Sequence, residues 1–488
     1  MSTDPHRALL SAAHHARASD ELAFIRNGRL ETDFARALEA LIDESGVVAL
    51  QRARRESTYT SEEARFVGRH IGHLAAHGAL LEARPIIARF LRSEIPVGSA
   101  SEIPSVLVSE LLSDASAQRG TAFAGALEPL ASRFVEIRGA AVRALRMQSE
   151  AFRVEPSSPL MAAEPNAHAP APMPTPTLTE RAEKFLSASD DAAREMAQWL
   201  TRSAAPSGKG GWPALASALR MSALDGLAKP ARRLFRVSEG ARRLGFERDL
   251  NSRLRIERSI PLLAPRSICI ALSVPRDVRL TLPSLDYGVL SDLAAARAVG
   301  EGLALALVSP ALSEILARPV ASGVSASLGV LFLQLRADRG YLIRVEGHSP
   351  DVAERLARHA AVFVLLNARL SAAIFVAEQN SSSERERLLQ LTAAGDRALG
   401  CELPAGLIGL AGLVSGFDGA DFDADACGLA AHAALRERFD EDWFVNPRVS
   451  EVLRGACARG NLLDGRDFCA ELGAAPDAAI ARAIELVE

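Results

Sequence analysis

Three histidines share one face of a predicted helix near the N-terminus. His70, His73 and His77 follow the spacing i, i+3, i+7 within residues 60–95, a segment that repeats apolar residues at helical intervals. Imidazoles placed in this way could bind one metal ion together. The same helix also carries an apolar stripe, so a half-buried polar face is the simpler interpretation of these histidines.

A second candidate is a cluster of aspartates at positions 418, 421, 423 and 425, which could bind a hard cation. A calcium loop requires Gly at its sixth position and Glu at its twelfth, but the residues at these positions, counted from Asp421, are Ala and His. We therefore predict that these acids lie at the N-terminus of a helix, where negative charge is favourable.

The third candidate is a basic stretch. Residues 229–258 hold ten basic and four acidic residues, a net charge of +6. One or two helices with such a charge could bind RNA or an acidic partner. Few aromatic residues are interleaved with the arginines, so the sequence does not predict nucleic acid binding.

The composition describes the kind of protein that must position these residues. The chain has 488 residues, is 48% hydrophobic and 24% charged, and carries a net charge of −4. These values are typical of a globular protein of two to four domains. The net charge is too small to attract the whole chain to nucleic acid or to an anionic membrane. No signal peptide pattern and no uncharged apolar run of about 18 residues is present, so we expect a cytoplasmic, bacterial protein without a membrane span. The five cysteines form no CxxC pair, which favours reduced thiols over a zinc site.

A proline-rich stretch divides the chain. Residues 155–177 contain seven prolines among Ala, Ser and Thr, a composition typical of an exposed linker. We therefore predict an N-terminal α-helical domain over residues 1–154 and a second domain over residues 178–488. Apolar residues at helical spacing run through the first part, for example over residues 30–46.

The second part changes its periodicity once. Residues 266–273 and 276–284 both alternate between apolar and polar side chains, which predicts two adjacent strands. Helices return afterwards, and Ser349 followed by Pro350 predicts the start of a long helix. The fold class is therefore mainly α with a small β-sheet or hairpin.

The order of these elements resembles a family of zinc peptidases. The passage "APRSICIALSVPRDVRLTLPSLDYGVLSDLAAARAVGEGLAL" is similar to the strand, strand, active-site helix segment of thimet oligopeptidase and oligoendopeptidase F. The later passage "GFDGADFDADACGLAAHAALRERFDEDWFVNPRVSEVLRGACARGNLLDG" resembles their C-terminal segment. The resemblance spans about residues 180–475 and implies a helical zinc-peptidase-like fold.

The resemblance also shows what this chain lacks. In that family a His-Glu-x-x-His motif places two zinc ligands on one helix face, and the Glu between them polarises the attacking water. No His-Glu pair occurs anywhere in the sequence, and the aligned helix holds Ser291, Asp292 and Ala295 at the vestigial zinc-site positions. Glu301 and Glu314 could supply the third ligand of the family, but one carboxylate alone does not retain zinc.

The resemblance therefore predicts a catalytically inactive peptidase-like protein, without a catalytic residue, metal or cofactor, that binds a peptide or protein segment in a retained cleft. The expected docking edge is residues 277–284, with Arg279, Thr281 and Asp292 as possible peptide-binding residues. Two alternatives stay open. One is an enzyme with an unrecognised or non-zinc site, and the other is a helical adaptor or scaffold protein.

Overall fold

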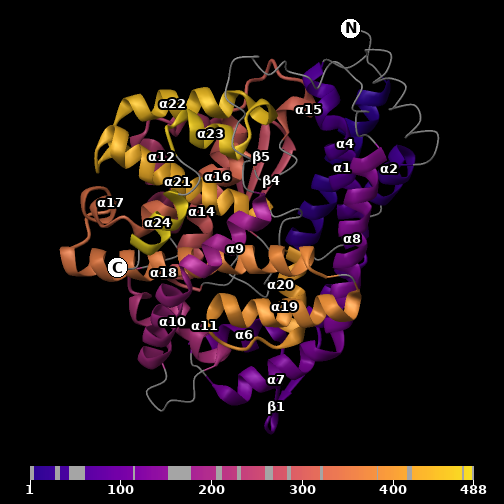
Figure 1. The fold of residues 1–488 in the computed structure, drawn as a ribbon, viewed down its shortest axis with the longest axis vertical. Coiled ribbons are helices and arrows are strands. Elements are labelled where there is room, and N and C mark those ends of the chain that lie inside the picture. Colours follow the sequence, from indigo (N-terminus) through magenta and orange to yellow (C-terminus); the bar gives the residue numbers. More distant parts are fainter. Residues whose placement is uncertain are drawn as a thin grey trace.

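Helices build almost the whole molecule (Figure 1). The computed structural model describes residues 5–27, 33–42, 61–113, 116–151, 177–204, 211–227, 232–258, 268–282, 287–318, 323–381, 383–414, 420–474 and 478–485. The predicted linker lies outside these residues except for Thr177, whose side chain caps the next helix.

The first part of the chain is helical as predicted, apart from one short hairpin of β1 (Ile95–Val97) and β2 (Ala100–Glu102). Its helices are α1 (Pro5–Asn27), α2 (Asp33–Ile42), α4 (Ser61–Leu80), α5 (Ala83–Leu91), α6 (Pro104–Ser113), α7 (Ala117–Leu127) and α8 (Ala131–Ala151). Helix α8 runs along one side of the molecule and packs against α4, so it connects the N-terminal helices to the rest (Figure 1).

The second part adds helices around a three-stranded sheet. Its strands are β3 (Leu254–Arg258), β4 (Ile268–Ser273) and β5 (Asp277–Leu282). Its helices are α9 (Leu178–Ala188), α10 (Asp190–Ala204), α11 (Trp212–Arg220), α12 (Arg233–Arg243), α13 (Glu247–Arg253), α14 (Val289–Leu307), α15 (Glu314–Ala317), α16 (Val324–Gln334), α17 (Arg339–Arg344), α18 (Pro350–Gln379), α19 (Glu384–Leu399), α20 (Ala405–Val414), α21 (Ala420–Phe439), α22 (Pro447–Ala458), α23 (Gly465–Glu471) and α24 (Ala478–Glu485).

The sheet contains one strand more than the sequence predicts. Strands β4 and β5 pair antiparallel, which confirms the predicted strand pair. Strand β3 then pairs parallel to β5 on its other side, so the strand order is β3-β5-β4. The basic residues 229–258 were expected on one or two helices, but the last five of them form strand β3.

The sheet lies between two helices that come from different parts of the chain. Helix α14 packs against β4 and β5 on one face. On the other face Ala18, Leu22 and Ile25 of α1 form a buried cluster with Ile270 of β4. Because side chains alternate along a strand, the two faces of β4 contact two separate helices.

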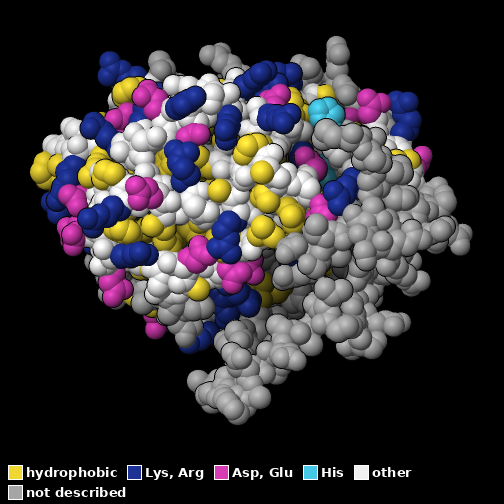
Figure 2. All heavy atoms as spheres, turned by 90° about the horizontal axis from the view of Figure 1, so that it is seen from above, with side chains coloured by type: hydrophobic (Ala, Val, Ile, Leu, Met, Phe, Trp, Pro, Cys, Tyr) yellow, Lys and Arg dark blue, Asp and Glu magenta, His cyan; other side chains and the backbone are white. Residues whose placement is uncertain are grey.

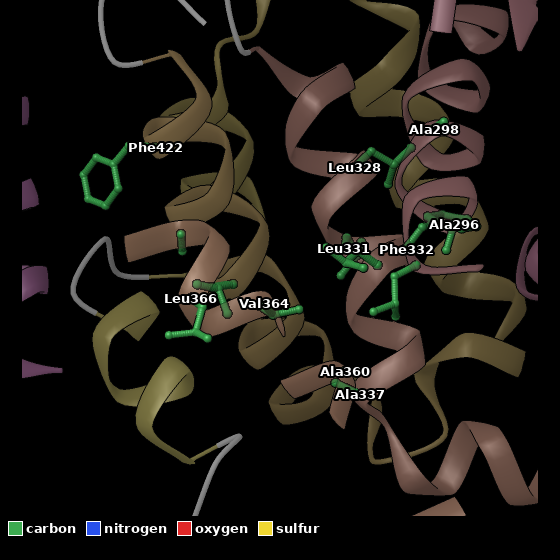
Figure 3. Close-up of a cluster of buried hydrophobic side chains, with 14 of the residues drawn as sticks. Ala296, Ala298, Leu328, Leu331, Phe332, Ala337, Ala360, Val364, Leu366 and Phe422 are labelled. Carbon is green, nitrogen blue, oxygen red and sulfur yellow. The ribbon is translucent and has the colours of Figure 1, made fainter. Parts of the chain in front are cut away.

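A large core surrounds α14, α16 and α18. Leu328, Leu331 and Phe332 of α16 lie against Ala296 and Ala298 of α14 (Figure 3). The same buried cluster includes residues between 83 and 137 as well as residues between 182 and 483, so the two predicted parts share one core. Their division into separate folding units stays a prediction.

Helix α18 begins at Pro350 with Ser349 as N-cap, as predicted. Among the described helices it alone is long and apolar enough to cross a membrane, but 78% of its apolar window is buried inside the protein. That burial is typical of the central helix of a folded core.

Candidate functional site

The candidate site lies where α14 crosses α16. A Cβ atom on Gly300 would lie 2.5 Å from the carbonyl oxygen of Leu328, and one on Gly329 would lie 2.5 Å from Cγ of Glu301. No larger residue fits at either position unless the helices move apart. The two glycines therefore allow the backbones to approach closely and bring the charged face of α14 against its neighbours.

Arg297 and Glu301 form the charged part of that face, at spacing i, i+4. Arg297 Nε lies 3.2 Å from Glu301 Oε1, and Arg297 Nη1 lies 3.2 Å from Asp425 Oδ1 on α21. The second oxygen of Asp425 accepts hydrogen bonds from Asn367 Nδ2 at 3.2 Å and Ser371 Oγ at 3.0 Å, both on α18. Three helices thus hold one buried carboxylate and its arginine.

Burial and charge act in opposite directions on this cluster. Burial raises the pKa of Asp425 to about 6, while the nearby Arg297 opposes that shift. Burial also works against the charged form of Arg297, yet Asp425 and Glu301 outweigh it and raise the pKa of that guanidinium. Arg297 is therefore a permanent cation between two carboxylates, and it can bind anions or orient acids but cannot bind a metal ion.

The first two turns of α14 carry the predicted vestigial positions, and the acid among them is already paired. Arg233 Nε donates to Asp292 Oδ1 at 2.8 Å, and Arg236 Nη2 donates to Asp292 Oδ2 at 2.6 Å. Asp292 is only 2% exposed. Both of its oxygens are used by α12, so this carboxylate holds α12 against α14.

The other two vestigial positions also face the interior. Ser291 Oγ accepts a hydrogen bond of 3.0 Å from the backbone N–H of Tyr287, and Ala295 is fully buried. These contacts place Ser291, Asp292 and Ala295 in structural roles. Their correspondence to the zinc ligands of a peptidase stays a prediction.

The predicted docking edge is wrong, because β5 is the central strand of the sheet. Its backbone pairs with β3 on one side and with β4 on the other. Arg279 donates to Glu257 at 2.6 Å and to Asp277 at 2.8 Å, and these hydrogen bonds raise the pKa of Arg279. The buried Thr281 hydroxyl donates to the carbonyl oxygen of Ile268 at 3.1 Å. An extended peptide therefore cannot pair with β5 while the sheet is intact.

The histidine face of α4 is used to pack the N-terminal helices. His70 Nδ1 lies 2.7 Å from His14 Nε2, and His70 Nε2 lies 2.8 Å from the carbonyl oxygen of Ile315. Burial lowers the pKa of His70 to about 3 and that of His73 to about 4, so both are neutral. Across the described residues, no group of three His, Cys, Asp or Glu side chains could hold a metal ion.

Much of the basic charge of residues 229–258 is also paired within the protein. Besides the two arginines on Asp292, Arg242 and Arg243 both lie within salt-bridge distance of Glu239. On the face shown in Figure 2, basic side chains are scattered among acidic and hydrophobic ones. Among the described side chains of that face, no single-sign stripe of the kind that is typical of a nucleic acid interface is present.

Asp421 and Asp423 of the acidic cluster lie in the first turn of a helix, α21, as predicted, whereas Asp425 lies in the next turn and is buried. Asp418 lies outside the described residues. The sequence analysis missed the pairing of Asp425 with Arg297. A signal was present, since Arg297 and Glu301 are charged residues one turn apart in a mostly apolar part of the helix, but the sequence does not reveal the partner 128 residues later.

A surface hollow of about 360 Å³ lies elsewhere, between α10 and α18. Arg358 lies over the Trp199 ring, with 4.6 Å between Cζ and the ring centroid, and Glu195, Met196 and Arg202 complete the lining. No residue of α14 lines this hollow.

Comparison with solved structures identifies the fold. The chain is similar to a Pyrococcus furiosus carboxypeptidase, with a TM-score of 0.55 and 13% identity over 100% of both chains. It is also similar to PZ peptidase A bound to an inhibitor, with a TM-score of 0.58 and 10% identity over 95% of this chain and 88% of that one. A putative oligoendopeptidase F from Bacillus anthracis gives a TM-score of 0.55 and 10% identity over 95% and 86%. No family model and no curated protein sequence matches the chain. The protein therefore has the helical metallopeptidase fold, as the sequence resemblance predicted.

Proposed function

We propose that this chain is a catalytically inactive peptidase-like protein that binds an extended peptide or protein segment. The likeness in fold to carboxypeptidases and an oligoendopeptidase F supports the peptidase-like part of this proposal. The inactivity and the ligand are inferred from the residues on α14 and on the sheet.

One observation carries the inactivity. Helix α14, which follows the strand pair, carries two charged residues at the i, i+4 spacing that a metal-binding helix uses for its ligands. These residues are Arg297 and Glu301. The guanidinium lies 3.2 Å from both Glu301 and Asp425, so both carboxylates are already paired with a cation. A zinc ion would also have to overcome the repulsion of a fixed positive charge. The cluster therefore stabilises the crossing of the helices and does not activate water.

The ligand is inferred from the sheet. Extended peptides bind by adding a strand to a sheet edge, where main-chain hydrogen bonds provide affinity for many sequences. Within the described part of the chain, β4 is an edge strand next to α14. We place the docking edge on β4, in place of the β5 edge expected from the sequence.

The test uses the purified full-length chain. It would be incubated with Zn²⁺, dialysed, and analysed for bound metal, for cleavage of internally quenched fluorogenic peptides, and for binding of fluorescein-labelled decapeptides randomised at every position. We expect no stoichiometric metal, no cleavage, and peptide binding that protects the amides of residues 268–273 from hydrogen exchange. Cleavage that depends on Zn²⁺ and stops with a chelator would contradict the proposed inactivity. Protection confined to other segments would contradict the proposed docking edge.

A pair of matched zinc grafts tests how α14 relates to a metal-binding helix. A His-Glu-x-x-His motif can be introduced in either of two registers. The first uses positions 291, 292 and 295, and the second uses positions 297, 298 and 301, so that Glu301 itself is replaced. We expect only the second register to bind Zn²⁺, because it faces Asp425 as a further carboxylate, whereas the first faces the arginines of α12. Zinc affinity in the first register alone would support the vestigial positions inferred from the sequence. The two variants are S291H/D292E/A295H and R297H/A298E/E301H.

A further inference from the structure

The edge of β4 is occupied by a side chain of the protein itself. Arg318, directly after α15, donates from Nη1 to the carbonyl oxygen of Ala271 at 2.6 Å and from Nη2 to that of Leu272 at 3.0 Å. Its Nε donates to Glu314 Oε1 at 2.7 Å, and the side chain is only 4% exposed. One guanidinium therefore satisfies two successive main-chain acceptors of the strand.

The local shape of β4 makes this possible. Successive carbonyl groups of a regular strand point toward opposite edges, so one side chain does not normally reach both. The register of β4 against β5 shifts between Ala271 and Ser273, which marks a β-bulge. A bulge bends the strand and interrupts its alternation, so it can turn both carbonyls toward the same arginine. The acceptors that Arg318 uses are main-chain groups of the kind that an added strand would use.

Contacts from two other parts of the chain hold the Arg318 segment in place. Asn461, in the turn of 3₁₀-helix Gly460–Leu462, donates from Nδ2 to the carbonyl oxygens of Ile315 at 2.8 Å and Arg318 at 2.6 Å. His70 of α4 also lies 2.8 Å from the carbonyl oxygen of Ile315. The backbone of α15 is thus fixed, while the Arg318 side chain has rotatable bonds that allow it to leave.

Burial of the charged Arg318 side chain favours its displacement from β4 when another ligand is present. Loss of hydration disfavours the charged guanidinium and lowers the pKa of Arg318, although Glu314 acts in the opposite direction. A buried charge regains its hydration when it moves to the surface. The hydrogen bonds that it gives up on β4 could be replaced by those of an incoming strand.

We propose that Arg318 is an intramolecular cap that keeps the β4 edge closed and that must swing aside before an extended segment can bind. This inference rests on the proposed function, because it concerns the same docking edge. It also explains how a sheet edge in this position avoids unwanted pairing with other chains, since edges that are covered or charged resist such association.

The test compares three variants of the full-length chain. Arg318→Ala removes the cap. Glu314→Gln keeps the arginine but weakens the ion pair that orients it, so it loosens the cap even if Arg318→Ala fails to fold. Arg253→Ala is the matched control, because Arg253 also donates to a main-chain carbonyl, that of Ala306 at the end of α14.

Two measurements test the closure of the β4 edge and the binding of peptide separately. The first is amide exchange of residues 268–273 without peptide, which we expect to become about tenfold faster in Arg318→Ala, less so in Glu314→Gln, and to stay unchanged in Arg253→Ala. The second is anisotropy with the labelled random decapeptides, for which we expect affinity to rise about tenfold in Arg318→Ala, the factor that about 1.4 kcal/mol represents.

Each outcome has a defined meaning. Unchanged exchange of β4 in both Arg318→Ala and Glu314→Gln would overturn the cap. Equal peptide affinity in wild type and variants, with β4 protected in all of them, would also overturn it while the proposed function stands. Faster exchange of β4 without peptide binding to any form would support the cap and overturn the proposed function.

Discussion

The arginine at the centre of the α14 cluster offers a quantitative test. Replacing Arg297 with Met keeps a long, flexible side chain but removes its positive charge. Among the described residues, Arg297 supplies the one ion pair of Asp425, with Nη1 3.2 Å from Asp425 Oδ1. Asn367 and Ser371 continue to donate to the other oxygen. The substitution therefore leaves Asp425 as a buried carboxylate with hydrogen bonds but without a counterion.

The expected cost follows from the burial of the two partners. Breaking a fully buried ion pair by removing one partner costs about 3–5 kcal/mol, because the charge left behind is uncompensated. The Arg297 side chain is 23% exposed and that of Asp425 is 3% exposed. Water can therefore reach part of the space left by Arg297, and we expect the free energy of unfolding at about pH 8 to fall by about 2–3 kcal/mol.

The cost should depend on pH in a definite direction. The pKa of Asp425 in the folded protein is raised from 3.8 to about 6, so the buried carboxyl destabilises the folded state as pH rises through that window. Loss of Arg297 raises this pKa further. The cost of Arg297→Met is then fully present above the raised pKa of the variant and disappears as pH falls below about 6, where the carboxyl is protonated in both proteins.

Urea unfolding followed by circular dichroism, at about pH 8 and about pH 5, measures both effects. The variant Asp425→Asn supplies the control, since adding it to Arg297→Met should restore stability at about pH 8 and have little effect at about pH 5. A cost that is the same at both pH values, or a double variant no more stable than Arg297→Met, would refute the assigned role of this pair.

Three further predictions concern packing, acid stability and the linker. Gly329→Leu should lower the free energy of unfolding by more than about 2 kcal/mol, because its Cβ meets Glu301 Cγ, whereas Gly125→Ala, with nothing within 4 Å, should be neutral or slightly stabilising in the same urea assay. Acid should loosen the N-terminal helices: burial holds the pKa of His70 at about 3 and that of His73 at about 4, below the unfolded value of 6.5, so stability is lost as pH falls from about 6.5 toward these values. Faster amide exchange in residues 61–80 than in residues 289–307 at low pH would show this, and equal acceleration in both would argue against it. Brief proteolysis should cut within residues 155–177, yet the two fragments should elute together from a gel-filtration column, because they share one core; separate elution would count against a shared core.

Much of the fold can be predicted from the sequence because its signals are local. The alternation over residues 266–284 places β4 and β5, since the side chains of a strand repeat every two residues. Ser349 and Pro350 mark the start of α18 because a helix N-terminus prefers these residue types. The expected metallopeptidase-like fold also rests on the order of such elements, and the comparison with solved structures confirms that fold.

The candidate site could be predicted only in part, because its contacts join distant segments. The missing His-Glu pair is a property of the sequence and needs no structure. That Arg297 pairs with Asp425, and that Asp292 is held by α12, depends on how closely the helices cross, which no local pattern contains. The prediction of β5 at the sheet edge fails for the same reason. Its parallel partner β3 is joined to it through a long connection, and no periodic pattern in the sequence shows which strand β3 pairs with.

The sequence alone therefore determined the helical class, the antiparallel strand pair and the absence of a His-Glu pair, since periodicity and residue identity are properties of neighbouring positions. Only the tertiary structure decided which strands lie at the edges of the sheet and which side chain donates to the β4 backbone. Arg318 reaches β4 across 47 residues, and whether a guanidinium meets two carbonyl oxygens depends on a bulge and on the packing of α15. Such contacts are set by the folding of the whole chain, because their free energy is gained only after all the surrounding elements have packed.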